Sequence, residues 1–366
     1  MWCEIILTKI IIIMKKINNF FFIGSVALML IVSASCTKEG PQGIAGKDGT
    51  NGTNGTDGTD GTATCVECHS SNQVIYAKEN QWAASMHATG SAFERNEGEC
   101  ATCHTSQGFR GNLDGSYVWT ETGAKIDNPN PQNCYTCHEI HQTYTAADLA
   151  LTVPSDAAIA LRNTTATHNF GKGNVCASCH QGRTVDPFPV AGGADITVTS
   201  SRYGVHHGPQ SNTLAGVGMG LFEVGDGLVN SAHATLIADA CVNCHMAEAY
   251  GTQSGGHSMW MGYEYHGATI LNTAGCEVSG CHEGEDVQAM TEEFQAEIAI
   301  LLAELKVKLD AAGITAEGSD NSVNGTYSGL VAGACLDYKA LTEDKSLGVH
   351  NPKYVKKLLT NLKEAL

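Results

Sequence analysis

The sequence predicts a mostly α-helical protein in which short helices are joined by long irregular loops, followed by a C-terminal group of longer helices. Two observations carry this prediction. Paired cysteines followed by histidine recur through residues 64–284, and apolar residues follow a helical period from residue 285 onward. The length of 366 residues is enough for one large domain or two modest ones.

The composition allows a packed core and restricts the partners. Hydrophobic residues make up 42% of the chain, and the formal net charge is −17 at pH 7. Nucleic acid is not expected as a partner of so acidic a chain. An acidic surface docks more readily on basic patches of other proteins.

The N-terminal residues have the pattern of an export signal. Met14 is followed by Lys15 and Lys16, and an apolar run extends from Phe20 to Val32. Small residues then precede Cys36, as at a lipidation site. We predict a lipoprotein signal peptide over residues 1–36, with its start at Met14 and lipidation at Cys36.

A transmembrane helix is the alternative for this run. No basic stop-transfer flank follows it, which favours the lipoprotein signal, although Ser33 stands where a bacterial lipobox usually has Leu. The expected location is outside the cytoplasm, on the outer membrane or facing the periplasm, or at the cell surface, with the membrane contacted through the lipid anchor.

Residues 37–63 form a collagen-like Gly-X-Y tract. Glycine recurs at every third position from Gly40 to Gly61, but Pro41 is its one proline. Proline-poor triplets make a weak triple helix, so a flexible tether is favoured over a trimerising stalk. An oligomer formed through this tract remains the alternative.

Six cysteine pairs, each followed directly by histidine, carry the chemistry of the chain. Five have two residues between the cysteines, and the sixth has four. They are Cys65/Cys68/His69, Cys100/Cys103/His104, Cys134/Cys137/His138, Cys176/Cys179/His180, Cys241/Cys244/His245 and Cys276/Cys281/His282.

This spacing predicts covalent attachment of haem c. Two thiols reach the two vinyl groups on one edge of the porphyrin, and the adjacent histidine binds the iron from the proximal side. Zinc ribbons and disulfides also use close cysteine pairs, but they do not require histidine after every pair. We therefore predict six haem c groups and a hexahaem-binding core over residues 64–284. The loops would wrap these haems, which gives a multihaem cytochrome c architecture.

The remaining cysteines fit this assignment. Twelve belong to the motifs, Cys36 is the predicted lipidation site, and Cys3 precedes Met14. Cys335 lies in an apolar stretch and is expected to be a small buried core residue.

Distal iron ligands are expected among the nine histidines outside the motifs, because six bis-histidine haems need six more. His266 has the weakest context, and the adjacent His206 and His207 are expected to supply one ligand. The candidates are His87, His141, His168, His206, His207, His233, His257 and His350.

The C-terminal residues 285–366 are predicted to form helices that pack on the haem core. Apolar residues at helical spacing predict one helix from about Glu285 to Ala311 and a second over Tyr327–Leu341. Asn351 as N-cap and Pro352 at the first position predict the start of a third. A Gly/Ser/Asn-rich loop is expected after Gly313.

Several segments resemble bacterial periplasmic and outer-surface multihaem cytochromes. They are SMHA at His87, HHGPQ at His206, GGHSMWM at His257 and GVHNPKY at His350, together with the haem motifs. The GVHNP tail is similar to the C-terminal part of the pentahaem nitrite reductases and their non-enzymatic relatives, which implies that His350 binds a haem iron. These reductases commonly have Cys-x-x-Cys-Lys at the catalytic haem, and this sequence has none.

These observations favour an electron-transfer lipoprotein over an enzyme, and no catalytic residue is assigned. Its expected partners are redox proteins of the periplasm or outer membrane, with an extracellular acceptor as a further option. One alternative is a terminal reductase of a nitrogen or sulfur oxyanion. Its open iron would be faced by Arg183, Arg202, Tyr203 and the unused member of the His206 and His207 pair. The other is a subunit of an extracellular cytochrome filament in which haems stack between copies.

Overall fold

The computed structural model describes residues 73–162, 164–190, 192–205, 208–216 and 222–366. All of these belong to one unit, Asp60–Leu366. The signal peptide, the tether, Cys36, the first motif with His69, and the pair His206 and His207 lie outside the described residues, so those assignments stay predictions.

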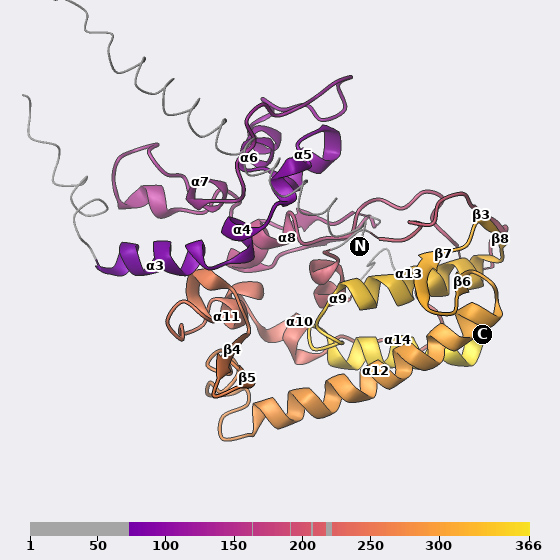
Figure 1. Cartoon of the computed structure of the whole chain (residues 1–366). Coiled ribbons are helices and arrows are strands. Elements are labelled where there is room, and N and C mark those ends of the chain that lie inside the picture. Colours follow the sequence, from indigo (N-terminus) through magenta and orange to yellow (C-terminus); the bar gives the residue numbers. More distant parts are fainter. Residues whose placement is uncertain (1–72, 163, 191, 206–207, 217–221) are drawn as a thin grey trace, which may run out of the picture. The chain divides into compact units, whose positions relative to one another are not determined.

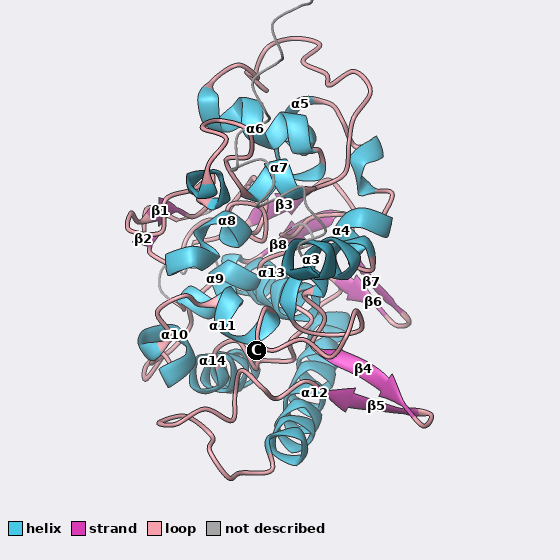
Figure 2. Cartoon of the chain, turned by 90° about the vertical axis from the view of Figure 1, so that its left-hand side faces the viewer, coloured by secondary structure: helices cyan, strands magenta, loops and turns pink. Residues whose placement is uncertain are grey.

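Helices dominate the described residues, and most of those before residue 285 are short (Figures 1 and 2). The α-helices are α3 (Gln73–Ala83), α4 (Met86–Thr89), α5 (Gly98–His104), α6 (Ser106–Asp114), α7 (Cys134–Cys137), α8 (Asn174–Ala177), α9 (Gln210–Ala215), α10 (Ala232–Leu236), α11 (Cys241–His245), α12 (Val287–Ala311), α13 (Gly329–Glu343) and α14 (Pro352–Ala365). The 3-10 helices are η1 (Ala92–Glu94), η2 (Ala146–Leu149), η3 (Gly171–Gly173) and η4 (Gly256–Ser258).

The strands are short and form four separate antiparallel pairs (Figure 2). The pairs are β1 (Ile159–Ala160) with β2 (Thr167–His168), β3 (Ile196–Val198) with β8 (Gly325–Tyr327), β4 (Gly262–Tyr265) with β5 (Ala268–Leu271), and β6 (Thr315–Ala316) with β7 (Ser319–Ser322). The β3–β8 pair, with Thr197 opposite Thr326, joins the middle of the chain to the C-terminal helices.

The largest apolar core belongs to the C-terminal helices. α12, α13 and α14 lie side by side in both views (Figures 1 and 2), and their apolar faces meet. Leu305, Leu336 and Leu358, one from each helix, are fully buried in this core. Residues 185–222 add further apolar side chains, among them Val198 and Phe222, so the core draws on both halves of the described chain.

The three predicted C-terminal helices are confirmed, with small shifts at their ends. α12 begins after Asp286, whose carboxylate accepts a hydrogen bond from the Ala289 N–H, and Gly313 follows its end with a φ of 75°. α13 is two residues later than predicted, because Ser328 caps it. Cys335 is fully buried, as expected.

Two local expectations were wrong in part. The stretch after Gly313 is not only a loop, because it contains β6, β7 and β8. Asn351 does precede α14, but its side chain does not cap that helix. Its amide instead donates to Thr213 O and Asn230 Oδ1, which ties the start of α14 to α9.

Candidate functional site

A single large cavity of about 2950 Å³ lies among the described residues. This volume is well above the several hundred cubic ångströms of an ordinary single-ligand pocket. The cysteines and histidines of all five described motifs line it. Protein interiors are normally close-packed, so a cavity of this size indicates a site for several large groups.

The motifs share a compact local geometry. Four of them have their first cysteine on a short helix: α5 for Cys100, α7 for Cys134, α8 for Cys176 and α11 for Cys241. In the motif of His138, the histidine N–H donates to the carbonyl of the first cysteine, Cys134, at 2.9 Å. The turn thereby presents both thiols and the imidazole from one short segment.

The long sixth motif closes in the same way. The His282 N–H donates to Cys276 O at 3.1 Å, although four residues separate the two cysteines. Gly280 takes a left-handed conformation with a φ of 84°, which accommodates the two extra residues. The longer loop therefore presents its two thiols and the imidazole from one short segment, as the shorter motifs do.

Among the described residues, four motif histidines each face a histidine from outside the motifs. The ring centroids are 6.0 to 6.4 Å apart. The pairs are His180 with His87, His138 with His257, His282 with His233, and His245 with His350. These four partners are all among the predicted distal candidates.

The separation fits two imidazoles on opposite sides of one metal ion. An imidazole nitrogen binds a transition metal at about 2 Å, and the ring centre lies about 1 Å behind that nitrogen. Two such ligands across an iron therefore have their centroids about 6 Å apart. The observed distances match this value in all four pairs, so the residues fit axial ligation of haem.

Hydrogen bonds at the other ring nitrogen orient these imidazoles. Six of the eight paired rings have an acceptor close to Nδ1, which leaves Nε2 to face the cavity. The contacts are His138 with Leu149 O (2.8 Å), His180 with Gln210 Oε1 (3.3 Å), His233 with Val349 O (2.7 Å), His245 with Met259 O (3.0 Å), His282 with Glu285 Oε2 (2.6 Å) and His350 with Asp344 Oδ1 (2.7 Å). Metal-binding histidines typically have such an outer partner.

Burial lowers the pKa of four of these imidazoles, which favours the neutral form that binds a metal; they are His87, His180, His245 and His257. Burial, followed by the charge of His180, lowers the pKa of His87 to about 4. Burial is also the main cause that lowers the pKa of His257 to about 4. For His350, burial lowers the pKa, but the charge and hydrogen bond of Asp344 outweigh it and the net shift is upward.

The cavity wall is more basic than the rest of the chain. Nine cationic and six acidic side chains line it, whereas the whole sequence has 21 Lys and Arg against 38 Asp and Glu. The cationic ones are Lys78, Arg95, Arg162, Lys172, Arg183, Arg202, Lys339, Lys345 and Lys353. Such a wall suits groups that bring carboxylates of their own, as haem does with its two propionates.

Thiols of different motifs lie next to each other. Hydrogen bonding between Cys103 and Cys179 lowers the pKa of the first and raises that of the second. The same kind of coupling joins Cys176 with Cys241 and Cys244 with Cys276. The eleven described cysteines are all free thiols. The motifs therefore adjoin in the order His104, His180, His245, His282.

The motif of His138 joins this row at the motif of His180. Cys137 packs with Cys176 and Cys179 around Phe109 and Val175. Burial raises the pKa of the Cys137 thiol to about 11, so it is not a thiolate at neutral pH. The motif of His180 thus has three neighbouring motifs, whereas that of His282 stands at one end of the row.

The remaining described histidines do not belong to these four pairs. His104, from the motif on α5, lines the cavity. His141 is exposed, with its Nδ1 2.9 Å from the Tyr135 hydroxyl, and the ring of His168 packs on Phe170. Neither is among the residues that line the cavity, and both remain predictions as ligands. His266, the weakest candidate, is exposed at the turn between β4 and β5.

Of the residues considered for an open reductase site, Arg183 and Arg202 line the cavity. Tyr203 is buried, and its hydroxyl donates to Pro187 O at 3.0 Å. The tyrosine therefore has a structural partner.

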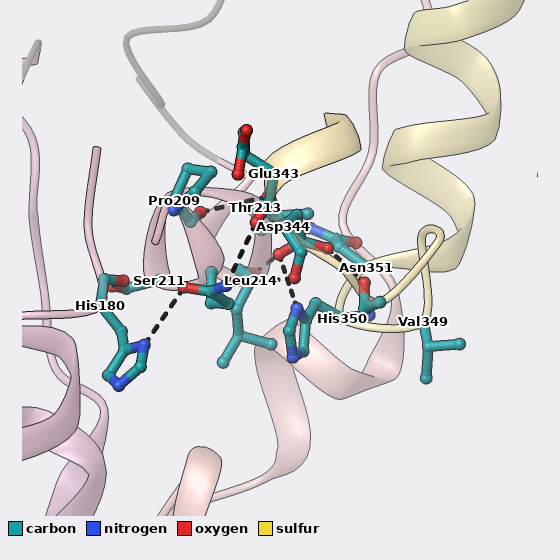
Figure 3. A network of polar contacts seen from close by, with 12 residues as sticks. His180, Pro209, Ser211, Thr213, Leu214, Glu343, Asp344, Val349, His350 and Asn351 are labelled. Atoms are coloured by element: carbon teal, nitrogen blue, oxygen red, sulfur yellow. Dashed lines mark hydrogen bonds and ion pairs between the residues drawn. The ribbon is translucent and has the colours of Figure 1, made fainter. Parts of the chain in front are cut away.

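Sequence reasoning missed the groups that orient the histidines. Glu285 follows His282 by three residues, a spacing that a closer inspection of the motif could have found. Asp344 precedes His350 by six residues and Gln210 follows His180 by 30, and neither spacing belongs to a repeat that predicts a contact. Figure 3 shows this region, with Asp344 directed at His350.

None of the helices among the described residues has the length and apolarity needed to cross a membrane. No cluster of three or more His, Cys, Asp or Glu side chains there is arranged to hold a metal ion.

Comparison with known proteins gave one similar structure to report. No protein-family model and no curated protein matches the chain. The crystal structure of the outer cell wall cytochrome OcwA is similar over 78% of this chain and 50% of that chain, with 21% identity and a TM-score of 0.48. The chain thus spans about half the length of that cytochrome, and the likeness is partial.

Proposed function

We propose that this chain is a multihaem c-type cytochrome that relays electrons through bis-histidine haems. The observation that carries the proposal is the set of four histidine pairs at 6.0 to 6.4 Å, each joining a motif histidine to one from outside the motifs. These eight histidines line the same cavity as the motif cysteines.

The residues have defined roles in this proposal. The cysteines would hold each haem by thioether bonds, the motif histidines would bind its iron, and His87, His233, His257 and His350 would supply the second iron ligand. Haem bound in this way supplies one-electron ferric/ferrous chemistry. With two histidines on each iron, these four sites would not admit a substrate to the metal. This favours electron transfer over catalysis.

The adjacency of the motifs supports a relay. Thiol contacts join the motifs of His104, His180, His245 and His282 in a row, and the motif of His138 adjoins that of His180. Neighbouring haems held by touching motifs are close enough to exchange electrons without a mobile carrier. A sixth haem at Cys65, Cys68 and His69 completes the proposal.

The proposal includes a place and partners for the relay. Lipidation at Cys36 and the Gly-rich tether would hold the haem domain outside the cytoplasmic membrane, at the outer membrane or the cell surface. Its partners would be redox proteins there, with an extracellular acceptor as one option. The charge of −17 suits docking on basic patches.

Expression in a host that matures c-type cytochromes tests the proposal. We expect about six haems per chain by pyridine haemochrome assay and intact mass, and ferric spectra dominated by low-spin iron. A colourless product of bare polypeptide mass would refute it. A high-spin haem that turns over nitrite or hydroxylamine would favour an oxyanion reductase, and ordered fibres in electron micrographs a filament subunit.

A further inference from the structure

The four histidine pairs differ in the charge of their outer partners. In the pairs of His138 and His180, the acceptors at Nδ1 are neutral: a backbone carbonyl and the Gln210 side-chain amide. In the pairs of His245 and His282, one histidine of each pair contacts a carboxylate. The two carboxylate-bonded sites are neighbours in the row of motifs.

Asp344 is the more enclosed of these carboxylates. It lies at the end of α13 with a side chain that is 0% exposed. One of its oxygens is 2.7 Å from His350 Nδ1, and the other accepts from the Ser346 hydroxyl (Figure 3). Both contacts fix the carboxylate on the imidazole, in surroundings where its charge is weakly screened.

Glu285 makes the same kind of contact from a more open position. Its Oε2 lies 2.6 Å from His282 Nδ1, and its side chain is 51% exposed. The opposite histidine of this site, His233, bonds to the neutral carbonyl of Val349. Each of the two sites thus has one carboxylate on one axial ligand.

A carboxylate on an axial imidazole changes the redox equilibrium of the iron. The negative charge pulls the Nδ1 proton toward itself and makes Nε2 a stronger donor. A stronger donor stabilises ferric iron more than ferrous iron, which lowers the reduction potential. A neutral carbonyl or amide has the same geometric role with a smaller electronic effect.

We propose that Asp344 and Glu285 give the haem sites of His245/His350 and His282/His233 the lowest reduction potentials among the sites described. The inference rests on the proposed function. Both carboxylates are positioning residues that act through the histidines.

This arrangement gives the relay a direction. With haem bound at these sites, a one-electron donor protein docked near the motif of His282 would reduce that site from ferric to ferrous. The electron would then pass to the site of His245 and on to that of His180, and each donor site would return to ferric as its neighbour became ferrous. No bond is made or broken. The lower potentials at the start of this path make the forward transfer favourable.

Potentiometric titration of the fully loaded protein tests the inference. Visible spectra and the EPR signals of low-spin ferric haem are followed in Glu285→Gln, Asp344→Asn and the double variant. We expect each single variant to shift one of the two lowest midpoint potentials upward and to move one EPR signal. In the double variant the two lowest potentials rise together.

Matched variants separate a hydrogen bond from a distant charge. Glu283→Gln removes the same charge beside His282, and Asp156→Asn removes one from the cavity wall. Both should leave the lowest potentials unchanged. If they shift them as far as the test variants do, the histidine contacts are not the cause. Asp344→Glu keeps a carboxylate and should restore the low potential.

The failure of this inference differs from the failure of the proposed function. Protein without haem, or with mainly high-spin iron, refutes the relay itself. Protein with low-spin haem, whose two lowest potentials stay in place in both Glu285→Gln and Asp344→Asn, refutes only the assignment of the carboxylates. Haem content verifies that the Asp344 variant folds. If the Asp344 variant does not fold, the Glu285 variant, changed at an exposed side chain, tests the role of the carboxylates.

Discussion

The C-terminal helices and the motif region are stabilised in different ways. Of the eleven largest fully buried side chains in the described residues, ten lie between Ile298 and Leu362, and Phe170 is the one elsewhere. The motif region instead surrounds the 2950 Å³ cavity with short helices and loops. One region is closed by its own side chains, whereas the other encloses a cavity that the proposed haems would fill.

The difference shows how so short a chain could hold many large cofactors. A region of this size can bury little apolar surface by itself, and its motifs are placed to bind rather than to pack. α12, α13 and α14 provide a core that needs no cofactor, and this core positions His350 and Asp344 at the cavity. The helices therefore act as a scaffold for part of the site.

The largest expected effect comes from withholding haem. We predict that chain made in a host without cytochrome c maturation loses protection from hydrogen exchange over residues 73–182 and 231–282, because the cavity is unfilled. α12–α14 should stay protected. Hydrogen exchange followed by mass spectrometry measures both regions in one sample. Equal protection of the motif region with and without haem would contradict the comparison.

A second prediction concerns the C-terminal core itself. Leu358 is fully buried between α12, α13 and α14, so Leu358→Ala should cost about 2–5 kcal/mol of stability. Ile300 is 60% exposed on α12, and Ile300→Ala is the control, expected to change stability by less than about 0.5 kcal/mol. Urea unfolding followed by far-UV circular dichroism compares the two. Similar losses would mean that this core does not support the fold.

The sequence predicts local features better than contacts between distant segments. The cysteine spacing and the 3.6-residue period are local, and so the motifs and α12–α14 could be found from the residues alone. The pairing of His245 with His350 brings together segments far apart in the chain, and nothing in their spacing encodes it. Asn351 illustrates the limit: its position before α14 was predicted, but its amide bonds to α9 instead.

The same spacing also leads to different outcomes. His168 and His233 each precede the next motif by eight residues. His233 faces His282 across the cavity, whereas His168 packs on Phe170. The segment just before His233 is anchored to the C-terminal part of the chain, because the Ser231 N–H donates to Asn351 Oδ1 at 2.8 Å, and no local pattern reveals this contact.

A third prediction tests a buried acid in the scaffold. Asp337 on α13 is fully buried; its Oδ1 accepts from the Phe222 N–H at 2.7 Å, and its Oδ2 has no hydrogen-bond partner. Burial raises the pKa of this carboxyl well above its usual value of 3.8. The folded state thus holds a proton that the unfolded state releases, and stability falls as pH rises from the unfolded pKa to the folded pKa.

Asp337→Asn removes this dependence. The variant should match the natural protein near about pH 4 and become more stable at higher pH, by about 1.4 kcal/mol for each pH unit between the two pKa values. Thermal unfolding of the loaded protein at several pH values measures the difference. A difference that does not change with pH would show that Asp337 is ionised in the fold.

The smallest expected effect is confined to a single site of the motif region. His257 faces His138 across the cavity, so His257→Ala should leave one haem five-coordinate and the others unchanged. That haem becomes high-spin and binds carbon monoxide, about one equivalent per chain. The hydrogen bond from the His257 backbone N–H to Gln81 does not involve the side chain and survives the change, so the backbone stays in place.

EPR and carbon monoxide titration count the high-spin haems, and His266→Ala, at an exposed turn, is the control. Entirely low-spin iron in the His257 variant would mean that His257 is not an iron ligand. The distance between the rings of His138 and His257 would then not indicate a shared metal. If instead the variant alone gains one high-spin haem while the helices keep their stability, the motif region and the scaffold respond separately, as their different construction requires.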